Sequence, residues 1–301
     1  MIITVTLNPA VDRYLFLDEL SWDKTNVVRD KKVICGGKGI NVSYYLSLLK
    51  QKNIASGFLF VDDEKIFKQQ INNSYTEVDF LTVKGKTREN LKINSQNQLL
   101  EINDNNFVTN DDRLNFLCYY EKYCRKGNII VLSGSLPDGC DRSDYTKLIK
   151  KAKENDCTVI LDTSKNALLN SWQYADVIKP NKEEFFELTG IEWNKMSKEK
   201  MKNYFFDKYL TVVSLGEEGS LFIKGDTVYK VEPLPVQVCS PVSAGDSMVA
   251  AIAYGLHNKM SLQEMIKLAA ALSSLVISKD YLIDFENKLV NLMKQVAVKE
   301  I

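Results

Sequence analysis

The sequence is poor in residues on which several common kinds of site depend. His257 is the only histidine among 301 residues, so we expect neither a Ser-His-Asp triad nor a metal site built from several histidines. The six cysteines are scattered and none belongs to a C-x-x-C pair, which is typical of free thiols in a reducing cytoplasm. The sequence therefore indicates a function that needs no histidine cluster and no disulfide framework.

The chain also lacks net charge and a long apolar run. Lysine plus arginine equals aspartate plus glutamate at 39 each, so no overall charge attracts nucleic acid or an anionic membrane. The most apolar stretch, residues 265–278, is shorter than a membrane span and contains Lys267. The first residues read as a strand and do not resemble a signal peptide. We expect a cytoplasmic protein with no nucleic-acid partner and no membrane partner.

What the chain does contain is an alternation of short apolar strands and helical stretches. Residues 40–51 and 143–155 have helical character. Near-continuous apolar strands separated by helices imply a parallel sheet covered on both faces. The predicted fold class is therefore α/β, a doubly wound and mostly parallel sheet with helices on both faces. The predicted strands are residues 2–7, 55–60, 128–134, 157–163, 176–181 and 210–216.

Two segments interrupt the alternation, at about residues 12–35 and 78–108. The first lacks helical periodicity, and the second reads as consecutive hairpin strands with turns at "KGK" and "NSQNQ". Ligands of parallel sheets bind at the carboxyl ends of the strands. We expect a single domain, residues 1–301, whose two interrupting segments form a small antiparallel lid over that edge.

A glycine-rich stretch, "CGGKGIN" at residues 35–41, precedes one predicted helix. It matches neither the phosphate-binding P-loop nor the dinucleotide fingerprint. Its glycines let the backbone approach a ligand closely, Lys38 supplies a cation and Asn41 a polar side chain. An ordinary tight turn before a helix explains the same residues equally well.

The stretch "KTRENLKI", residues 86–93, places three polar side chains within the predicted lid. Arg88 is expected in the middle of a strand, with Asn90 and Lys92 on the same face by the two-residue period. A cationic face suits a phosphate-bearing substrate, because arginine can bind phosphate through two parallel hydrogen bonds. A strand face that simply points into solvent is the alternative.

Two further stretches each follow a predicted strand. In "IKPNKEEFFELTG", residues 178–190, Asn181 and Glu184 could hold a hydrated Mg²⁺ or could form a capping box, and the local pattern favours the cap. The stretch "VVSLGEEGSLF", residues 212–222, could line a nucleotide base or could be an ordinary hairpin. Neither stretch identifies a function by itself.

Near the carboxyl terminus, "SPVSAGDSMVAA", residues 240–251, leads into an apolar helix after Pro241, which is expected to end the preceding strand. Consecutive backbone N–H groups at that helix start would bind developing negative charge. The carboxylate of Asp246 could accept a proton from a substrate hydroxyl during phosphoryl transfer. For this stretch alone, helix capping by Asp246 or Ser243 is the favoured explanation.

Taken in order, these stretches resemble the ribokinase-like sugar kinases, the PfkB family. The chain resembles that family nearly from end to end, and "GGKGIN" with "TRENLKI" is most similar to its phosphosugar branch, 1-phosphofructokinase and tagatose-6-phosphate kinase. The stretches that carry the resemblance are "TLNPAVD", "GGKGINVS", "KTRENLKI", "LSGSLPDG", "VILDTS", "IKPNKEE", "VVSLGEEGSL" and "SPVSAGDS".

The resemblance implies an ATP-dependent and Mg²⁺-dependent kinase of a ketohexose phosphate, with Asp246 as the general base. It favours phosphorylation of fructose 1-phosphate to fructose 1,6-bisphosphate. Tagatose-6-phosphate kinase and a non-catalytic sugar-phosphate binding protein are the alternatives. It also implies a homodimer formed through the lid.

The resemblance assigns further residues to the site. The amides of Ala244, Gly245 and Asp246 would bind the transferred phosphoryl group, and Asn181 with Glu184 would organise Mg²⁺, through water. Ser214, Gly216 and Gly219 match the nucleotide-binding turn. Where the family has glycine before the Ala-Gly-Asp sequence, this chain has Ser243. The positions assigned to the sugar are Asp12, Gly36, Gly37 and Asn41, and those assigned to its phosphate are Lys38, Arg88, Lys24 and Lys92.

Overall fold

The main sheet of the protein is mixed, with a parallel centre and an antiparallel end. The computed structural model describes residues 1–95, 98–240 and 242–301. Eleven strands join in the order β15-β14-β13-β12-β11-β10-β9-β1-β4-β5, with β6 also paired to β4. All neighbouring strands in the part of the sheet that contains β12, β11, β10, β9, β1, β4, β5 and β6 pair in parallel. At the other end, β12, β13, β14 and β15 pair antiparallel. The strands are β1 (Ile2–Thr6), β4 (Asn53–Phe60), β5 (Thr76–Val78), β6 (Leu81–Val83), β9 (Ile129–Ser133), β10 (Thr158–Asp162), β11 (Val177–Ile178), β12 (Leu210–Ser214), β13 (Ser220–Lys224), β14 (Thr227–Val231) and β15 (Val298–Glu300).

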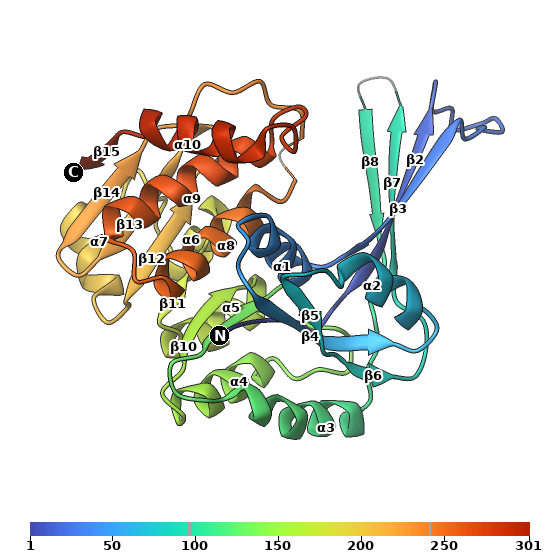
Figure 1. Cartoon of the computed structure of the whole chain (residues 1–301), viewed down its shortest axis with the longest axis horizontal. Helices are drawn as coiled ribbons and strands as arrows, with labels where there is room; N and C mark the ends of the chain where they lie inside the picture. The colour runs from blue at the N-terminus through green and yellow to red at the C-terminus, as the bar shows by residue number, and fades with distance from the viewer. Residues whose placement is uncertain (96–97, 241) are drawn as a thin grey trace.

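Helices cover both faces of this sheet (Figure 1), which confirms the predicted doubly wound α/β class. Successive side chains of a strand point to opposite faces of the sheet, so both faces are apolar and need a covering layer. In β1, for example, Ile2 packs into one core and Ile3 into the other. The first core is shared with α1 (Lys38–Leu48), α8 (Ala244–His257), α9 (Leu262–Val276) and α10 (Phe285–Gln295). The second is shared with α3 (Asn110–Tyr120), α4 (Asp144–Lys153), α5 (Lys165–Ser171), α6 (Lys182–Thr189) and α7 (Lys198–Phe205). The remaining helical segments are α2 (Glu64–Ile71) and the short 3₁₀ turns η1 (Glu121–Tyr123), η2 (Trp172–Tyr174) and η3 (Gly216–Glu218).

The predicted strands and helices occur where the sequence placed them, with one strand shortened. The strand expected at 176–181 is only the two residues of β11. Pro180 lies just beyond it and has no N–H group with which to continue the ladder. Among the described helices, none has the length and apolarity needed to cross a membrane.

A small second sheet stands apart from the main one (Figure 1), as predicted. It has the order β3-β2-β7-β8 and consists of two antiparallel hairpins. The two inner strands, β2 and β7, pair in parallel. Both strands run away from the main sheet. Their pairing is therefore parallel, and it connects the two hairpins into one sheet. Its strands are β2 (Ala10–Leu17), β3 (Asp30–Gly36), β7 (Glu89–Ser95) and β8 (Gln98–Asn103).

One part of the segment assigned to the lid belongs to the main sheet instead. Residues 81–83 form β6, which pairs in parallel with β4. Val83 is buried in the main core, and burial of this side chain favours the main sheet over an exposed hairpin. The "KGK" turn, residues 84–86, therefore connects β6 to β7 and does not form a hairpin. Part of the expected "NSQNQ" turn (residues 96–97) and the strand end expected at Pro241 lie outside the described residues.

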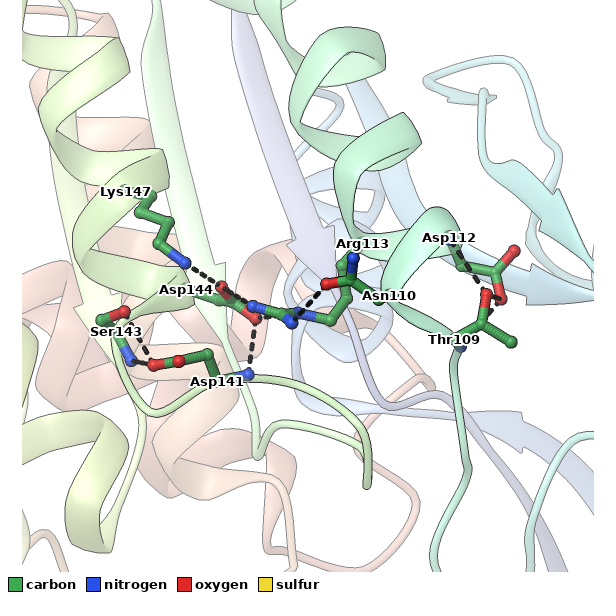
Figure 2. A network of polar contacts seen from close by, with 8 residues as sticks. All are labelled: Thr109, Asn110, Asp112, Arg113, Asp141, Ser143, Asp144 and Lys147. Atoms are coloured by element: carbon green, nitrogen blue, oxygen red, sulfur yellow. Dashed lines mark hydrogen bonds and ion pairs between the residues drawn. The ribbon is translucent and has the colours of Figure 1, made fainter.

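A charged network fixes the loop between β9 and α4 against α3 (Figure 2). Arg113 of α3 donates from Nε and Nη2 to the two carboxylate oxygens of Asp144, each at 2.8 Å. Lys147 donates to the same carboxylate at 3.0 Å, and the backbone N–H of Asp141 donates to it at 2.8 Å. Because Asp144 is only 6% exposed, these partners replace the water that its charge loses. The network therefore ties the loop between β9 and α4 to the start of α3.

Candidate active site

Loops and helix ends from several elements meet at the carboxyl edge of the parallel strands. The glycine turn of residues 36–37 opens α1, and α1 packs beside α8 in the same core. Asp162 is the last residue of β10, and Lys179 follows β11. Since neighbouring parallel strands end at the same edge, side chains at these positions come within hydrogen-bond distance of one another.

Asp246 lies in the first turn of α8 and its side chain is directed into the protein. The residue is 6% exposed, and the Asn41 side-chain amide donates to its Oδ2 from 2.8 Å. Burial, reinforced by the charge of Asp162, raises the pKa of Asp246 to about 6, while Lys38, Asn41 and Lys179 oppose that rise. Ser243 makes no side-chain capping bond to this helix. The capping explanation favoured for this stretch alone is therefore wrong.

Beside Asp246, a second buried carboxylate holds two lysines. Asp162 is 1% exposed and lies 3.2 Å from Nζ of Lys179 and 3.3 Å from Nζ of Lys38. Burial alone would raise the pKa of Asp162, but Lys179 and Lys38 together lower it. The pKa of Lys38 is raised, chiefly by Asp162. Asp162 therefore holds the Nζ atoms of both lysines close to Asp246.

Asp162 and Lys179 were not identified as site residues from the sequence. Both occur within stretches that carried the family resemblance, "VILDTS" and "IKPNKEE". The only local signal is that Asp162 ends one buried apolar strand and Lys179 directly follows another. Their pairing depends on the neighbouring positions of β10 and β11 in the sheet, which no spacing in the sequence reveals.

The start of α8 exposes backbone donors next to these charges. The first N–H groups of a helix have no partner within the helix, and they carry its positive dipole end. A Cβ added to Gly245 would lie 3.1 Å from Nζ of Lys179, so the absence of a side chain lets the ammonium approach the backbone. The N–H groups of Ala244, Gly245 and Asp246 together with Lys179 make a positive surface for an anion.

A cavity of about 860 Å³ adjoins this helix start. Its wall includes Ala244 and Gly245, so it opens directly onto the positive surface. Gly219 turns the chain between η3 and β13 with φ 85°, and a Cβ there would lie 2.0 Å from the Val231 carbonyl oxygen. Only glycine fits that turn. The sequence-predicted residues of this cavity are Asn181, Ser214, Gly216 and Gly219, and all four line it.

Asn181 and Glu184 form the capping box that the local sequence favoured. The Asn181 side chain accepts from the Glu184 N–H at 2.8 Å, and Oε2 of Glu184 accepts from the Asn181 N–H at 2.9 Å. Burial raises the pKa of Glu184, with Lys38 and Lys179 among the groups opposing it. The cap leaves Oε1 of Glu184 available near the two lysines. In the described part of the chain, no three His, Cys, Asp or Glu side chains gather as a metal cluster.

The second sheet presents a polar face that includes several predicted residues. Nδ2 of Asn90 donates to Oδ1 of Asp12 at 2.8 Å, and Nζ of Lys92 lies 3.6 Å from Oδ2 of Asp12. Asn90 and Lys92 therefore share a face, as expected from the strand period. A Cβ at Gly36 would lie 2.9 Å from Oδ2 of Asp12, so glycine leaves room for that carboxylate.

Arg88 lies just before β7, and the expectation of a mid-strand position is wrong. Its guanidinium donates to the backbone carbonyls of Pro9 at 3.2 Å, Asn8 at 3.3 Å and Asp104 at 3.0 Å. Burial lowers its pKa. In the described structure its positive charge is held mainly by neutral oxygens, and no carboxylate forms an ion pair with it, so the charge remains available to an anion.

The fold places Lys24 apart from the predicted residues at the start of α1. It is exposed in the loop that joins β2 to β3, at the end of the hairpin that points away from the main sheet (Figure 1). Gly37, Lys38 and Asn41, in contrast, begin α1 at the candidate site. Within one chain, Lys24 does not join Asp246.

Comparisons with known proteins identify the family to which the chain is similar. The family model described as pfkB family carbohydrate kinase matches residues 6–288. Tagatose-6-phosphate kinases from two strains of Staphylococcus epidermidis are 34% identical over 283 residues, 91% of this chain and 91% of each relative.

Solved structures share the fold. A possible 1-phosphofructokinase from Thermotoga maritima gives a TM-score of 0.86 at 23% identity, covering 100% of this chain and 99% of that one. Phosphofructokinase-2 from Escherichia coli, in complex with fructose-6-phosphate, gives 0.85 at 23% identity and covers 98% of both chains.

Proposed function

The chain belongs to the pfkB family of carbohydrate kinases, which transfer a phosphoryl group to an alcohol, and we propose that its acceptor is a ketohexose phosphate. The donor in this proposal is ATP, and Asp246 is the general base. The observation that carries the proposal is the position of the Asp246 carboxylate. It is buried beside two lysines at a helix start that opens onto a large cavity.

In this proposal the residues around Asp246 each contribute to positioning or to charge stabilisation. The carboxylate accepts the proton of the acceptor hydroxyl, and its pKa of about 6 leaves it ionised at neutral pH while keeping it more basic than an ordinary aspartate. The amides of Ala244, Gly245 and Asp246 bind the transferred phosphoryl oxygens. Lys38 and Lys179, held by Asp162, neutralise charge on the same group.

The resemblance gave Lys38 to the acceptor's own phosphate. Because Lys38 pairs with Asp162 next to the base, we assign it to the transferred phosphoryl group instead. Arg88 then serves the acceptor's phosphate, since its guanidinium has neutral partners and can form two parallel hydrogen bonds to a phosphate. Asp12 and Asn90, on the polar face of the second sheet, are positioned for sugar hydroxyls.

Mg²⁺ fits this site only as a hydrated ion. Magnesium in proteins keeps several waters and takes one or two carboxylates together with substrate phosphates. Asn181 and Glu184 use their capping oxygens on the backbone, which leaves Oε1 of Glu184 for a water of the ion. The ion would supply charge neutralisation between the nucleotide phosphates, and the residues of this chain would orient its water shell.

We propose fructose 1-phosphate as the acceptor, phosphorylated at its 6-hydroxyl. The proposal rests on the lid stretch "TRENLKI", which is most similar to 1-phosphofructokinase. Tagatose 6-phosphate is the second candidate, because relatives 34% identical to this chain are named for it. Both sugars carry a phosphate at one end and a hydroxyl at the other. In this proposal Asp246 serves the hydroxyl end and Arg88 the phosphate end of either sugar.

An ADP-release assay with ATP and Mg²⁺ tests the proposal and separates the candidates. Fructose 1-phosphate, tagatose 6-phosphate and no sugar would be compared under the same conditions. Release that is fastest with fructose 1-phosphate, and slow without sugar, is the expected result. Thermal stabilisation by a sugar phosphate with no ADP release from any mixture would overturn the kinase proposal and leave a binding protein.

We also propose that the second sheet acts as a lid and as the contact of a homodimer. A lid would exclude water from the phosphoryl group, so that ATP is not hydrolysed. Trp22, Val27, Leu99 and Ile102 lie on the hairpins of this sheet and are each more than half exposed. The outer strands β3 and β8 are sheet edges. Exposed apolar side chains beside open edges favour association with a second copy.

A further inference from the structure

Ser243, immediately before α8, has an unfavourable backbone conformation. Its φ of 67° and ψ of 4° lie in the left-handed region, which glycine adopts freely and serine does not. The family pattern has glycine at this position. A serine side chain here therefore costs stability unless its hydroxyl makes contacts that offset the backbone.

The hydroxyl contacts the amide that holds the candidate base. Nδ2 of Asn41 lies 3.4 Å from Oγ of Ser243 and 2.8 Å from Oδ2 of Asp246. A side-chain amide nitrogen carries two hydrogens, so it can serve both oxygens at once. If the Asn41 amide group were rotated by half a turn, its oxygen would face the Asp246 carboxylate and the two would repel. With Ser243 and Asp246 both able to accept from Nδ2, the orientation in which Asn41 donates to Asp246 is favoured.

We propose that Ser243 is a positioning residue for the base: its hydroxyl orients Asn41, and Asn41 orients the Asp246 carboxylate. The inference rests on the proposed function, since it concerns the residue that would remove the acceptor proton.

The other charged groups that face Asp246 do not depend on Ser243. Lys38 comes from α1, Asp162 from the end of β10 and Lys179 from the residue after β11. Lys38 and Lys179 bond to Asp162 and not to Ser243. A change in the titration of Asp246 on substitution of Ser243 therefore reports the Asn41 contact.

The test compares Ser243→Gly and Ser243→Ala with a matched control, Lys259→Gly. Lys259 also has left-handed φ, 55°, and it lies beyond the opposite end of α8. Both glycine variants should melt at a higher temperature, because each relieves the same backbone strain. Lys259→Gly should keep the kcat of the unchanged chain. Both Ser243 variants should lose about three- to tenfold in kcat, the effect of one hydrogen bond, with the KM for ATP unchanged.

A measurement without nucleotide or sugar keeps this inference separate from the proposed function. The carboxyl carbon of Asp246 is followed by NMR in ¹³C-labelled, ligand-free protein, with its signal assigned by Asp246→Asn. Weaker donation from Asn41 should move its titration midpoint to higher pH in both Ser243 variants. A Ser243→Gly protein that melts higher but keeps the kcat and the midpoint of the unchanged chain would overturn the proposal. Absence of turnover in the unchanged chain would defeat the proposed function, while the NMR titration would still decide the role of Ser243.

Discussion

At the scale of single residues, the raised pKa of Asp246 sets how activity should depend on pH. A base must be ionised, so kcat/KM should fall about tenfold per pH unit below the pKa of about 6 and level off above it. Lys38 lowers this pKa. Lys38→Met should therefore shift the acid limb to higher pH, in addition to lowering kcat. A pH profile of both proteins checks this, and an acid limb that does not move would contradict the assigned cluster.

The same carboxylate should reduce the stability of the fold. Its pKa of about 6 in the folded chain exceeds the ordinary value of 3.8, so the folded state binds the proton more tightly than the unfolded state. Stability from this group is present at pH below the ordinary value and is lost as pH rises through 6.

Asp246→Asn should accordingly stabilise the protein at pH 8 by on the order of 2–3 kcal/mol, and by little below pH 4. Denaturant unfolding at both pH values is the measurement. An equal effect at the two pH values would show that the charge is not the cause.

The residues of the site differ in how far the sequence reveals them. Gly37, Lys38 and Asp246 lie in short stretches whose glycines and helix starts are local signals. Asp162 and Lys179 meet only because β10 and β11 are neighbours in the sheet. Arg88 was predicted in a strand, yet it lies before β7, where backbone carbonyls of the main domain and of residue 104 hold it. Contacts of this kind depend on how strands and loops pack in the folded chain, and the spacing of residues in the sequence does not reveal them.

At the scale of elements, the link between α3 and α4 in Figure 2 should contribute measurably to stability. Arg113→Met leaves the buried Asp144 with Lys147 as its remaining side-chain cation, which should cost about 1–3 kcal/mol. Lys126→Met is the control, since Lys126 and Asp156 form a pair whose side chains are 86% and 71% exposed. Its effect should be close to zero. Equal effects of the two substitutions on chemical denaturation would be evidence against the network's role.

The elements themselves were largely predictable, because apolar alternation and caps are local. The parallel strands and the capping box at Asn181 were expected from the sequence. The exception was β6: its three residues resemble lid strands in composition, and only the burial of Val83 beside β4 assigns them to the main sheet. Long-range strand pairing was the part of the fold that the local pattern could not give.

At the scale of the whole molecule, the exposed apolar side chains of the second sheet predict a homodimer. Light scattering should give twice the chain mass of 34.3 kDa. Replacing Leu99 and Ile102 with glutamate should produce monomers, because like charges would then face each other across the contact. The pair Leu114→Glu and Leu169→Glu, which are exposed apolar positions on α3 and α5, is the control and should remain dimeric. A monomeric mass for the unchanged chain would rule out this assembly.

The central claim, that Asp246 removes the proton of the acceptor, is tested most directly by the kcat of Asp246→Asn. The substitution keeps the shape of the side chain and is expected to stabilise the fold, so a loss of activity cannot be ascribed to unfolding. ADP release from ATP and the preferred ketohexose phosphate should fall by roughly 10²–10⁴-fold. A kcat within a few-fold of the unchanged chain would contradict the account and leave Asp246 a structural residue of α8.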